Sequence, residues 1–320
     1  MQQPIASIAN LNQRSQLLRI VRQFFENCDF VEVETPLLSP EIIPELHIEP
    51  VEAVDGTDTL RCRSHHLQAS PELHMKRLIA VGMPAIFQIT KSFRSGERGP
   101  LHNPEFTIAE WYRAGDNMQA GMKLLDELCQ TTLKTSAARL TSYAAAFEKH
   151  AGINPHAASV EQLSARARSL NLAVPGEFRG QNHDGWLNLL LALQVEPQLG
   201  RDRPEILYDY PVSQAALAET EIQEGRIEVA KRFELYWQGV ELANGYQELT
   251  DAKELRSRLE KVNRDRQADG RQRLPLPESL LAAMEAGLPP CAGCALGFDR
   301  LAMLACGAKS IDEVVAFSNR

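Results

Sequence analysis

Two alternating segments joined by a short polar loop constrain the fold of this chain more than any other feature. Residues 84–94 and 104–112 alternate apolar and polar side chains, which is the period of a β-strand. The loop between them, at 95–100, is rich in glycine and charge. We therefore predict an antiparallel hairpin with a polar loop.

Helices and further strands are expected around this hairpin. Apolar residues at helical spacing predict a helix over 13–27, followed by a short alternating strand over 29–34 that Pro36 ends. Further strands are predicted at 208–211, 233–237 and 240–246, and further helices at 251–269 and 297–305. The pattern favours an α+β fold with a mixed, mostly antiparallel sheet flanked by helices.

Composition supports a single large domain over residues 1–320. The chain is 44% hydrophobic, and an Ala- and Leu-rich stretch over about 116–198 is expected to be a mostly helical insertion. Six cysteines without an apolar leader indicate a reducing, cytoplasmic setting, and no apolar run is long enough to span a membrane. A net charge of −8 argues against diffuse binding of nucleic acid.

The segment from Phe93 to Thr107 carries the strongest chemical signal. Arg94 ends the first strand, and His102, Asn103 and Phe106 follow the loop. A fixed cation suits a phosphate, and an aromatic ring can stack on a purine. Taken alone, the segment is equally compatible with a surface hairpin that holds an ordinary salt bridge and a core phenylalanine.

Three glutamates recur at intervals of seven residues: Glu234, Glu241 and Glu248. If Gln238 and Gly239 form a two-residue turn, Glu234 faces Ala243, Tyr236 faces Glu241, and the first two carboxylates share one face of a hairpin. Two such carboxylates can hold Mg²⁺ against phosphates. The alternative is a row of solvated acids, which the apolar neighbours make less favourable.

A third cluster runs from Gly293 to Leu301. Small residues there allow close approach of a ligand, and the helix expected from Gly297 onward has an N-terminal end that favours anions. Arg300 lies in its first turn and is placed to reach a phosphate. A glycine-rich turn alone is a weak signal, so the argument depends on all three clusters together.

These residues together resemble a known family. The strings 31–36, 93–106 and 297–300 are similar to motifs 1, 2 and 3 of class II aminoacyl-tRNA synthetases, and 70–77 and 241–245 are similar to lysyl-tRNA synthetases in particular. Only about a dozen residues precede the first predicted helix, so the anticodon-binding OB-fold domain is expected to be absent. In this respect the chain resembles a truncated paralogue that joins a lysine-type amino acid to a lysine of translation elongation factor P.

The resemblance implies a role for each matching position. Arg94 and Arg300 are the catalytic candidates, and Glu234 and Glu241 are the magnesium ligands. ATP is expected to contact Arg94, Ser95, Gly96, Glu97, His102, Asn103, Phe106, Glu241, Leu242, Gly297 and Arg300. The amino acid is expected to contact Ser70, Pro71, Glu72, Tyr112, Glu248 and Ala295. Glu72 would hold the amino group near the carboxylate, and Tyr112 and Glu248 the side-chain ammonium.

The sequence departs from the family pattern at two of these positions. Gly96 stands where the family usually has a glutamate, so Glu97 is the candidate replacement at the adenine amino group. Ala295 stands where lysyl-tRNA synthetases usually have glycine. Its methyl group is expected to reshape the amino-acid pocket in favour of β-lysine.

The expected activity is ATP- and Mg²⁺-dependent activation of lysine or β-lysine as an acyl-adenylate. The acyl group would then pass to a lysine side chain of elongation factor P, with a homodimer as the working form and tRNA not used. Two alternatives stay open: a minimal enzyme that charges tRNA or adenylates an amino acid, and an inactive module that only binds a ligand.

Overall fold

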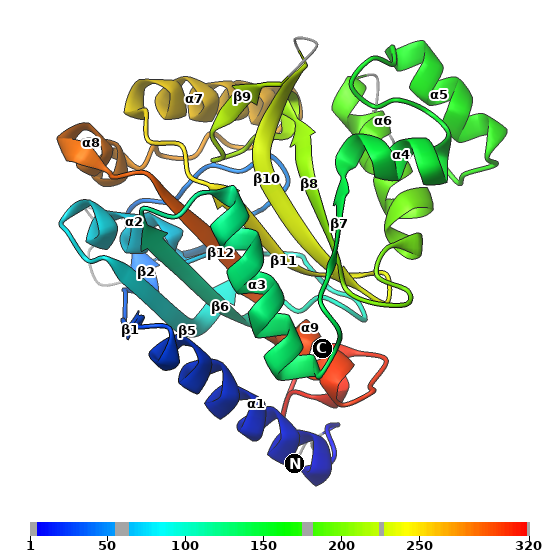
Figure 1. Cartoon of the computed structure of the whole chain (residues 1–320). Coiled ribbons are helices and arrows are strands. Elements are labelled where there is room, and N and C mark those ends of the chain that lie inside the picture. The colour runs from blue at the N-terminus through cyan, green and yellow to red at the C-terminus, as the bar shows by residue number, and fades with distance from the viewer. Residues whose placement is uncertain (1–4, 55–63, 175–181, 224–226, 319–320) are drawn as a thin grey trace. The chain divides into compact units, whose positions relative to one another are not determined.

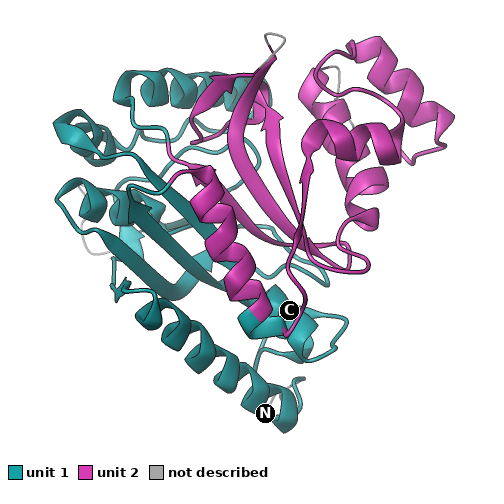
Figure 2. Ribbon diagram, viewed as in Figure 1, with its two compact units in different colours: residues 1–116, 131–133, 249–320 teal, residues 117–130, 134–248 magenta. Residues whose placement is uncertain are grey.

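The computed structural model describes residues 5–54, 64–174, 182–223 and 227–318, which form two compact units (Figure 2). Unit 1 consists of residues 1–116, 131–133 and 249–320, and unit 2 of residues 117–130 and 134–248. Each unit is described by itself below. The assignment of the whole chain to one domain stays a prediction.

The strands of unit 1 follow the order β1-β5-β6-β12. They are β1 (Val31–Glu32), β5 (Ala85–Phe93), β6 (Glu105–Ala114) and β12 (Cys291–Gly297). The predicted hairpin is confirmed, because β5 and β6 pair antiparallel from Ala85 opposite Arg113 to Phe93 opposite Glu105. β12 also pairs antiparallel with β6, whereas β1 runs parallel to β5.

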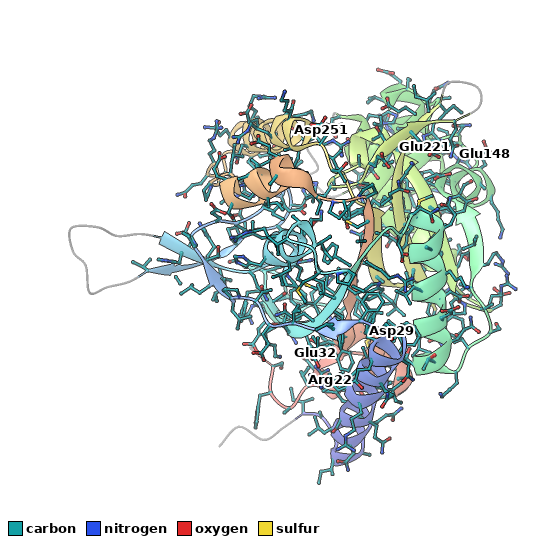
Figure 3. The ribbon with its side chains drawn as sticks, turned by 60° about the vertical axis from the view of Figure 1, so that its left-hand side comes forward. Arg22, Asp29, Glu32, Glu148, Glu221 and Asp251 are labelled. Atoms are coloured by element: carbon teal, nitrogen blue, oxygen red, sulfur yellow. The ribbon has the colours of Figure 1, made fainter. Side chains whose placement is uncertain are left out.

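Helix α1 (Ile8–Asn27) lies alongside these strands in unit 1 (Figure 1). The Ser7 side chain caps its first turn, so α1 begins five residues before the predicted helix and ends where predicted. The Phe25 ring stacks on Phe87 of β5, with the ring centroids 4.7 Å apart. Arg22 of α1 and Glu32 of β1 also form an ion pair, at 3.0 Å (Figure 3).

The remaining elements of unit 1 are a small second sheet and five helices among the described residues. A small three-stranded sheet has the order β2-β4-β3, formed by β2 (Leu38–Ser39), β3 (Val51–Val54) and β4 (Ser64–Leu67). The helices are α2 (Glu72–Ala80), α7 (Ala252–Ala268), α8 (Glu278–Gly287), α9 (Phe298–Ala305) and the short η4 (Ile311–Glu313). The predicted helices over 251–269 and 297–305 are thus confirmed as α7 and α9.

The strands of unit 2 follow the order β11-β10-β8-β7, with β9 beside β10. They are β7 (Arg139–Ser142), β8 (Glu205–Pro211), β9 (Thr220–Ile222), β10 (Glu228–Trp237) and β11 (Val240–Gln247). The turn between β10 and β11 is the predicted two-residue turn. Gln238 and Gly239 both have positive φ, at 55° and 75°, as a type I′ turn requires.

The helices of unit 2 pack around a core of their own. They are α3 (Met118–Leu133, whose last three residues belong to unit 1), α4 (Tyr143–Ala151), α5 (Val160–Ser169), α6 (His183–Leu190), η1 (Leu191–Val195), η2 (Glu196–Gln198) and η3 (Val212–Gln214). Tyr143, Phe147, Leu163 and Leu187 are buried in this core. The stretch 116–198 also contains strand β7, and its residues 175–181 lie outside the described part of the chain.

The α+β fold with mixed, mostly antiparallel strands and flanking helices is therefore confirmed. Within the described residues, no helix is both long and apolar enough to cross a membrane.

Candidate active site

The loop between β5 and β6 is held in place by backbone hydrogen bonds of its first two residues. The Arg94 N–H donates to the Pro104 carbonyl and the Ser95 N–H to the Glu49 carbonyl, both at 2.8 Å. The Arg94 guanidinium lies 5.0 Å from the centroid of the Phe106 ring. Its Nε is buried and has no hydrogen-bond partner among the described atoms. An anionic oxygen would satisfy that donor.

Glu97 and Gly96 occupy the outer part of the same loop. Glu97 Oε1 lies 3.8 Å from an Arg94 guanidinium nitrogen, so the candidate adenine contact is also the neighbour of the candidate phosphate ligand. Gly96 has φ of +78° and no heavy atom within 4 Å of where a Cβ would stand. Glycine is favoured there by the backbone conformation, and the loop has open space beside it.

The loop is tied to motif 3 by a contact between His102 and Arg300. His102 Nε2 lies 2.7 Å from an Arg300 guanidinium nitrogen, and Arg300 Nε donates to the Leu101 carbonyl at 3.2 Å. A guanidinium only donates, so Nε2 must accept, and the ring proton of His102 sits on Nδ1. Desolvation and the Arg300 cation lower the pKa of His102, which keeps the ring neutral as this contact requires.

The first turn of α9 is anchored by Asp299. Its Oδ1 pairs with Arg14 of α1 at 2.6 Å, and its Oδ2 accepts the backbone N–H of Thr107 at 3.0 Å. Arg14 also donates to the Thr107 hydroxyl at 2.9 Å. Sequence reasoning missed Arg14, because nothing in the local pattern of α1 distinguishes this arginine from those of a solvated helix face.

A buried carboxyl group lies near the middle of β6. Glu110 Oε2 accepts a hydrogen bond from the Ser70 hydroxyl at 2.8 Å, and Oε1 accepts one from the Tyr112 hydroxyl at 2.5 Å. Burial and the nearby Glu72 charge raise the pKa of Glu110 to about 7. Sequence reasoning missed Glu110, although one acid inside a run of buried strand residues was a usable signal.

A second buried acid accompanies Glu110. Glu72 opens helix α2, directly after Pro71, and its backbone N–H donates to the Ser70 hydroxyl at 3.1 Å. Its carboxylate pairs with Lys76, one turn along the helix, at 2.5 Å. Ser70, Glu72 and Tyr112, three of the predicted amino-acid contacts, are thus brought together in unit 1, with Glu110 among them.

Ala295 belongs to the same cluster through the strand register. On β12 it lies directly opposite Glu110 of β6, and Gly293 lies opposite Tyr112. Residues opposite each other across an antiparallel pair point to the same face. The Ala295 methyl group is therefore positioned beside the Glu110 carboxyl group, and Gly297 follows two residues later at the start of α9.

Glu234 of unit 2 is already hydrogen-bonded by its neighbours. Its Oε2 accepts from the hydroxyl groups of Tyr210 and Tyr236, both at 2.5 Å, and its Oε1 pairs with Arg232. A carboxylate has about four lone-pair sites, so three donors leave about one for another ligand.

The predicted register of the β10–β11 hairpin needs one correction. Tyr236 does face Glu241, but Glu234 faces Asn244 and not Ala243. The pairing shifts by one residue between Leu235 and Tyr236, which leaves Leu242 as the extra residue of a β-bulge.

Glu241 shares a sheet face with Glu234 despite this shift. The Tyr236 hydroxyl donates to Glu234, two residues earlier on β10, and Tyr236 lies directly opposite Glu241 of β11. All three side chains therefore point to the same face. Among the described residues, no three His, Cys, Asp or Glu side chains form a metal-binding group. Mg²⁺ at phosphate sites usually takes only one or two carboxylates, so the pair still fits that ion.

Glu248 is buried just beyond the end of β11, and its backbone bridges to Ala218. Strand β11 continues through Asn244 and Gly245 as far as Gln247. Asn244 Nδ2 donates to the Tyr246 hydroxyl at 2.8 Å on the same side of the strand. The predicted roles of Glu234, Glu241, Leu242 and Glu248 stay predictions.

The fold and these clusters define a member of a nucleotide-dependent, amino-acid-activating class. The family model for class II tRNA synthetases (D, K and N) matches residues 6–320. The chain belongs to this family.

The similarity extends to curated proteins over nearly their full length. An "Elongation factor P--(R)-beta-lysine ligase" of Klebsiella pneumoniae (strain 342) is 44% identical over 317 residues, which covers 99% of this chain and 97% of that protein. A protein with the same name from Salmonella paratyphi B (strain ATCC BAA-1250 / SPB7) is 43% identical over the same length and shares.

Proposed function

We propose that the chain is an ATP-dependent ligase that activates (R)-β-lysine and transfers it to a lysine side chain of elongation factor P. The observation that carries the proposal is the buried Glu110 carboxyl group, bonded by Ser70 and Tyr112 and accompanied by Glu72. Buried acids of this kind suit a ligand with ammonium groups. The relatives named above support both the amino acid and the acceptor.

The side chains around motif 2 suit ATP. The buried Nε of Arg94, which has no hydrogen-bond partner within the described part of the chain, is available to a phosphate oxygen. Arg300 presents a second cation, which contacts His102. Phe106 is partly exposed and offers an aromatic ring for a purine. Asn103 lies on the same loop, and Gly297 lies at the start of α9. Both positions support their proposed contacts to the nucleotide.

The first step forms the acyl-adenylate. An oxygen of the amino-acid carboxylate attacks the α-phosphorus of ATP, the bond to the bridging oxygen breaks, and pyrophosphate leaves. Arg94 and Arg300 neutralise the charge that develops on the phosphate oxygens, so no protein nucleophile is needed. Glu234 and Glu241 are the proposed ligands of Mg²⁺, which would further neutralise phosphate charge when bound.

The second step transfers the acyl group. The neutral ε-amine of the acceptor lysine attacks the acyl carbon, an amide forms, and AMP leaves with the bonding electrons. A lysine amine has a reference pKa of about 10.4, so a proton must leave the acceptor before or during attack. In this proposal Glu72 binds the substrate's amino group near its carboxylate, and Tyr112 and Glu248 bind the side-chain ammonium.

The test is pyrophosphate exchange followed by product analysis. The protein is incubated with ATP, Mg²⁺ and either L-lysine or (R)-β-lysine, first alone and then with elongation factor P or with total tRNA. We expect exchange with β-lysine to exceed exchange with L-lysine, and a mass increase of one lysyl unit on one lysine of the protein acceptor. Efficient charging of tRNA with the protein acceptor unmodified would reject the proposal in favour of a minimal tRNA-charging enzyme.

We further propose a homodimer, built through α1 and β1 in the manner of motif 1 in this family. Exposed apolar side chains on these elements, such as Ile8 and Val31, support it. Because elongation factor P acts in translation, the proposed location is cytoplasmic. Sedimentation as a monomer at micromolar concentration would contradict the dimer.

A further inference from the structure

Arg266 is a buried cation near the C-terminal end of α7. Its side chain is 0% exposed, and it donates five hydrogen bonds within unit 1. A buried guanidinium is unfavourable unless its N–H groups are satisfied, because it loses its hydration. The acceptors are the backbone carbonyls of Glu45, Ile48 and Gln272, at 2.8, 3.2 and 3.0 Å, and both carboxylate oxygens of Glu49, at 2.9 Å.

Most of these bonds go to one short segment, residues 45–49, in the connection between β2 and β3. The segment contains neither a helix nor a strand, so a backbone ladder does not satisfy its carbonyl groups. Arg271, which follows α7, donates to the Leu46 carbonyl of the same segment. Arginine side chains from the end of α7 therefore set where this segment lies.

Glu49 connects the anchored segment to the loop between β5 and β6. Its carboxylate receives Arg266, and its backbone carbonyl accepts the Ser95 N–H at 2.8 Å. Ser95 directly follows Arg94, the proposed phosphate ligand. Arg266 is thus linked to Arg94 through Glu49 and one backbone hydrogen bond.

The far end of the same loop is held by other elements. The Pro100 carbonyl accepts the Ile311 N–H of η4 at 2.9 Å, and the Leu101 carbonyl accepts from Arg300 at 3.2 Å. Loss of the Arg266–Glu49 pair should therefore displace the start of the loop and leave its far end attached. A misplacement of about 1 Å in a catalytic contact can cost about a hundredfold in rate.

Stability alone does not account for this arrangement. A buried ion pair is often no more stabilising than apolar side chains of similar volume. The Glu49 side chain is 43% exposed, so it does not fill a position in the core. A planar guanidinium can, however, bind carbonyl groups and a carboxylate in one fixed geometry, which favours a role in placing the backbone.

We propose that the Arg266–Glu49 pair is a positioning contact for ATP: it fixes the Glu49 carbonyl, which holds Ser95 and so places the Arg94 guanidinium against the phosphates. Neither Arg266 nor Glu49 needs to touch the nucleotide. This role rests on the proposed function, since it takes Arg94 to bind ATP.

The experiment measures the Kd for ATP with Mg²⁺ by calorimetry, and kcat and both KM values by pyrophosphate exchange with (R)-β-lysine. Glu49→Ala, Glu49→Gln and Arg266→Lys are compared with the wild type and with Glu278→Ala. Glu278 also binds an arginine of α7 through two hydrogen bonds, with Arg256 at 2.9 and 2.6 Å, but this pair lies at the exposed surface. It is the matched control.

We expect Glu49→Ala and Arg266→Lys to raise the Kd and the KM for ATP by about tenfold, because Arg94 loses much of a charge-assisted contact. Glu49→Gln keeps an oxygen that can accept from Arg266, so its values should lie between those of Glu49→Ala and the wild type. The KM for (R)-β-lysine should stay within about twofold, since Glu110 is held by groups outside this segment. Glu278→Ala should match the wild type in every value.

A purely structural role predicts a different pattern. A smaller folded fraction lowers kcat and leaves both KM values unchanged, and this result in Glu49→Ala would overturn the positioning role. An ATP Kd that rises equally in Glu49→Ala and Glu278→Ala would also overturn it. If Arg266→Lys does not fold, the two Glu49 variants and the control still decide the question.

Failure of the proposed function gives separate results. Wild-type protein that binds ATP without exchange dependent on lysine or β-lysine would reject the proposed function, and the ATP Kd of the variants would still test the positioning role. Wild-type protein that does not bind ATP would reject both. Lysine-dependent exchange with an unchanged ATP Kd in Glu49→Ala would reject the positioning role alone.

Discussion

Ala295 lies directly opposite Glu110 in the antiparallel register of β12 and β6, so its methyl group faces the same side as the buried carboxyl group. The one position where the chain departs from the glycine of lysyl-tRNA synthetases is therefore beside a residue that the sequence did not single out. A single methyl group in a pocket is worth about 1–3 kcal/mol of discrimination. Ala295 is thus well placed to select between amino acids that differ in where an amino group sits.

Replacing this methyl group should change the choice of amino acid. We expect Ala295→Gly to shift the ratio of kcat/KM for L-lysine over (R)-β-lysine by about tenfold in favour of L-lysine. Ala292→Gly is the control, since it makes the same change on β12 opposite Arg113. Equal ratios in the two variants and the wild type would show that the methyl group does not select.

Glu110 should impose a distinctive pH dependence on stability. Burial raises its pKa from the ordinary 4.5 to about 7 in the folded chain, so between these pH values the folded state keeps a proton that the unfolded state loses. The contribution of Glu110 to the free energy of unfolding is greatest below pH 4.5 and falls as the pH rises from 4.5 to 7. Above pH 7 the free energy of unfolding is lower by about 3 kcal/mol on this account.

The variant Glu110→Gln should remove that loss. Denaturant unfolding at pH 5 and pH 8 is compared for both proteins, and the variant's free energy of unfolding should fall less between the two. Because both proteins share the other titrating groups, the difference reports Glu110. An identical pH dependence would mean that Glu110 ionises as freely in the folded chain as in the unfolded one.

Protonation of His102 should weaken ATP binding. The pKa of His102 is lowered from 6.5, so the neutral ring dominates at pH 7, and its benefit is lost as the pH falls below 6.5 toward the folded value. The protonated ring no longer accepts from Arg300 and repels it. We expect the KM for ATP to rise below pH 6 in the wild type.

His102→Gln should reduce this acid effect, since a glutamine oxygen can still accept from Arg300 and does not titrate. ATP KM values at pH 5.5 and 7.5 provide the measurement. A variant that shows the same acid rise as the wild type would place the titrating group elsewhere.

Arg94 and Glu248 should affect different kinetic parameters. Arg94→Ala should nearly abolish adenylate formation, because it removes a cation from the developing phosphate charge. Glu248→Gln should mainly raise the KM for the amino acid, since it is the proposed partner of the side-chain ammonium. Pyrophosphate exchange measures both, and equal effects on both parameters in the two variants would contradict these roles.

The Arg14–Asp299 pair should stabilise the fold far more than a surface pair of the same helix. Both side chains are mostly buried, so Arg14→Met leaves an unpaired carboxylate and should lower the free energy of unfolding by about 3 kcal/mol. Arg22→Met breaks the exposed pair with Glu32 and should change it by less than about 1 kcal/mol. Similar losses in the two variants would show that burial of the Asp299 pair adds nothing.

Local pattern was sufficient to predict the elements that carry the site. The β5–β6 hairpin, the Gln238–Gly239 turn, and helices α7 and α9 were all predicted within a few residues, because strand and helix periods are set by neighbours in the sequence. Motif residues such as Arg94 and Arg300 could be named because they lie inside contiguous strings. The bulge at Leu242 was not predicted, since it depends on how β10 and β11 pair.

The sequence by itself determined which side chains are available, and the tertiary structure decided which of them meet. Glu110 meets Ser70 across 40 residues, and Asp299 meets Thr107 across 192. Arg14 likewise gained its importance from partners on other elements, Asp299 of α9 and Thr107 of β6. Hydrogen bonds and ion pairs act over only a few ångströms, so groups distant in sequence become one cluster only when packing removes the water between them.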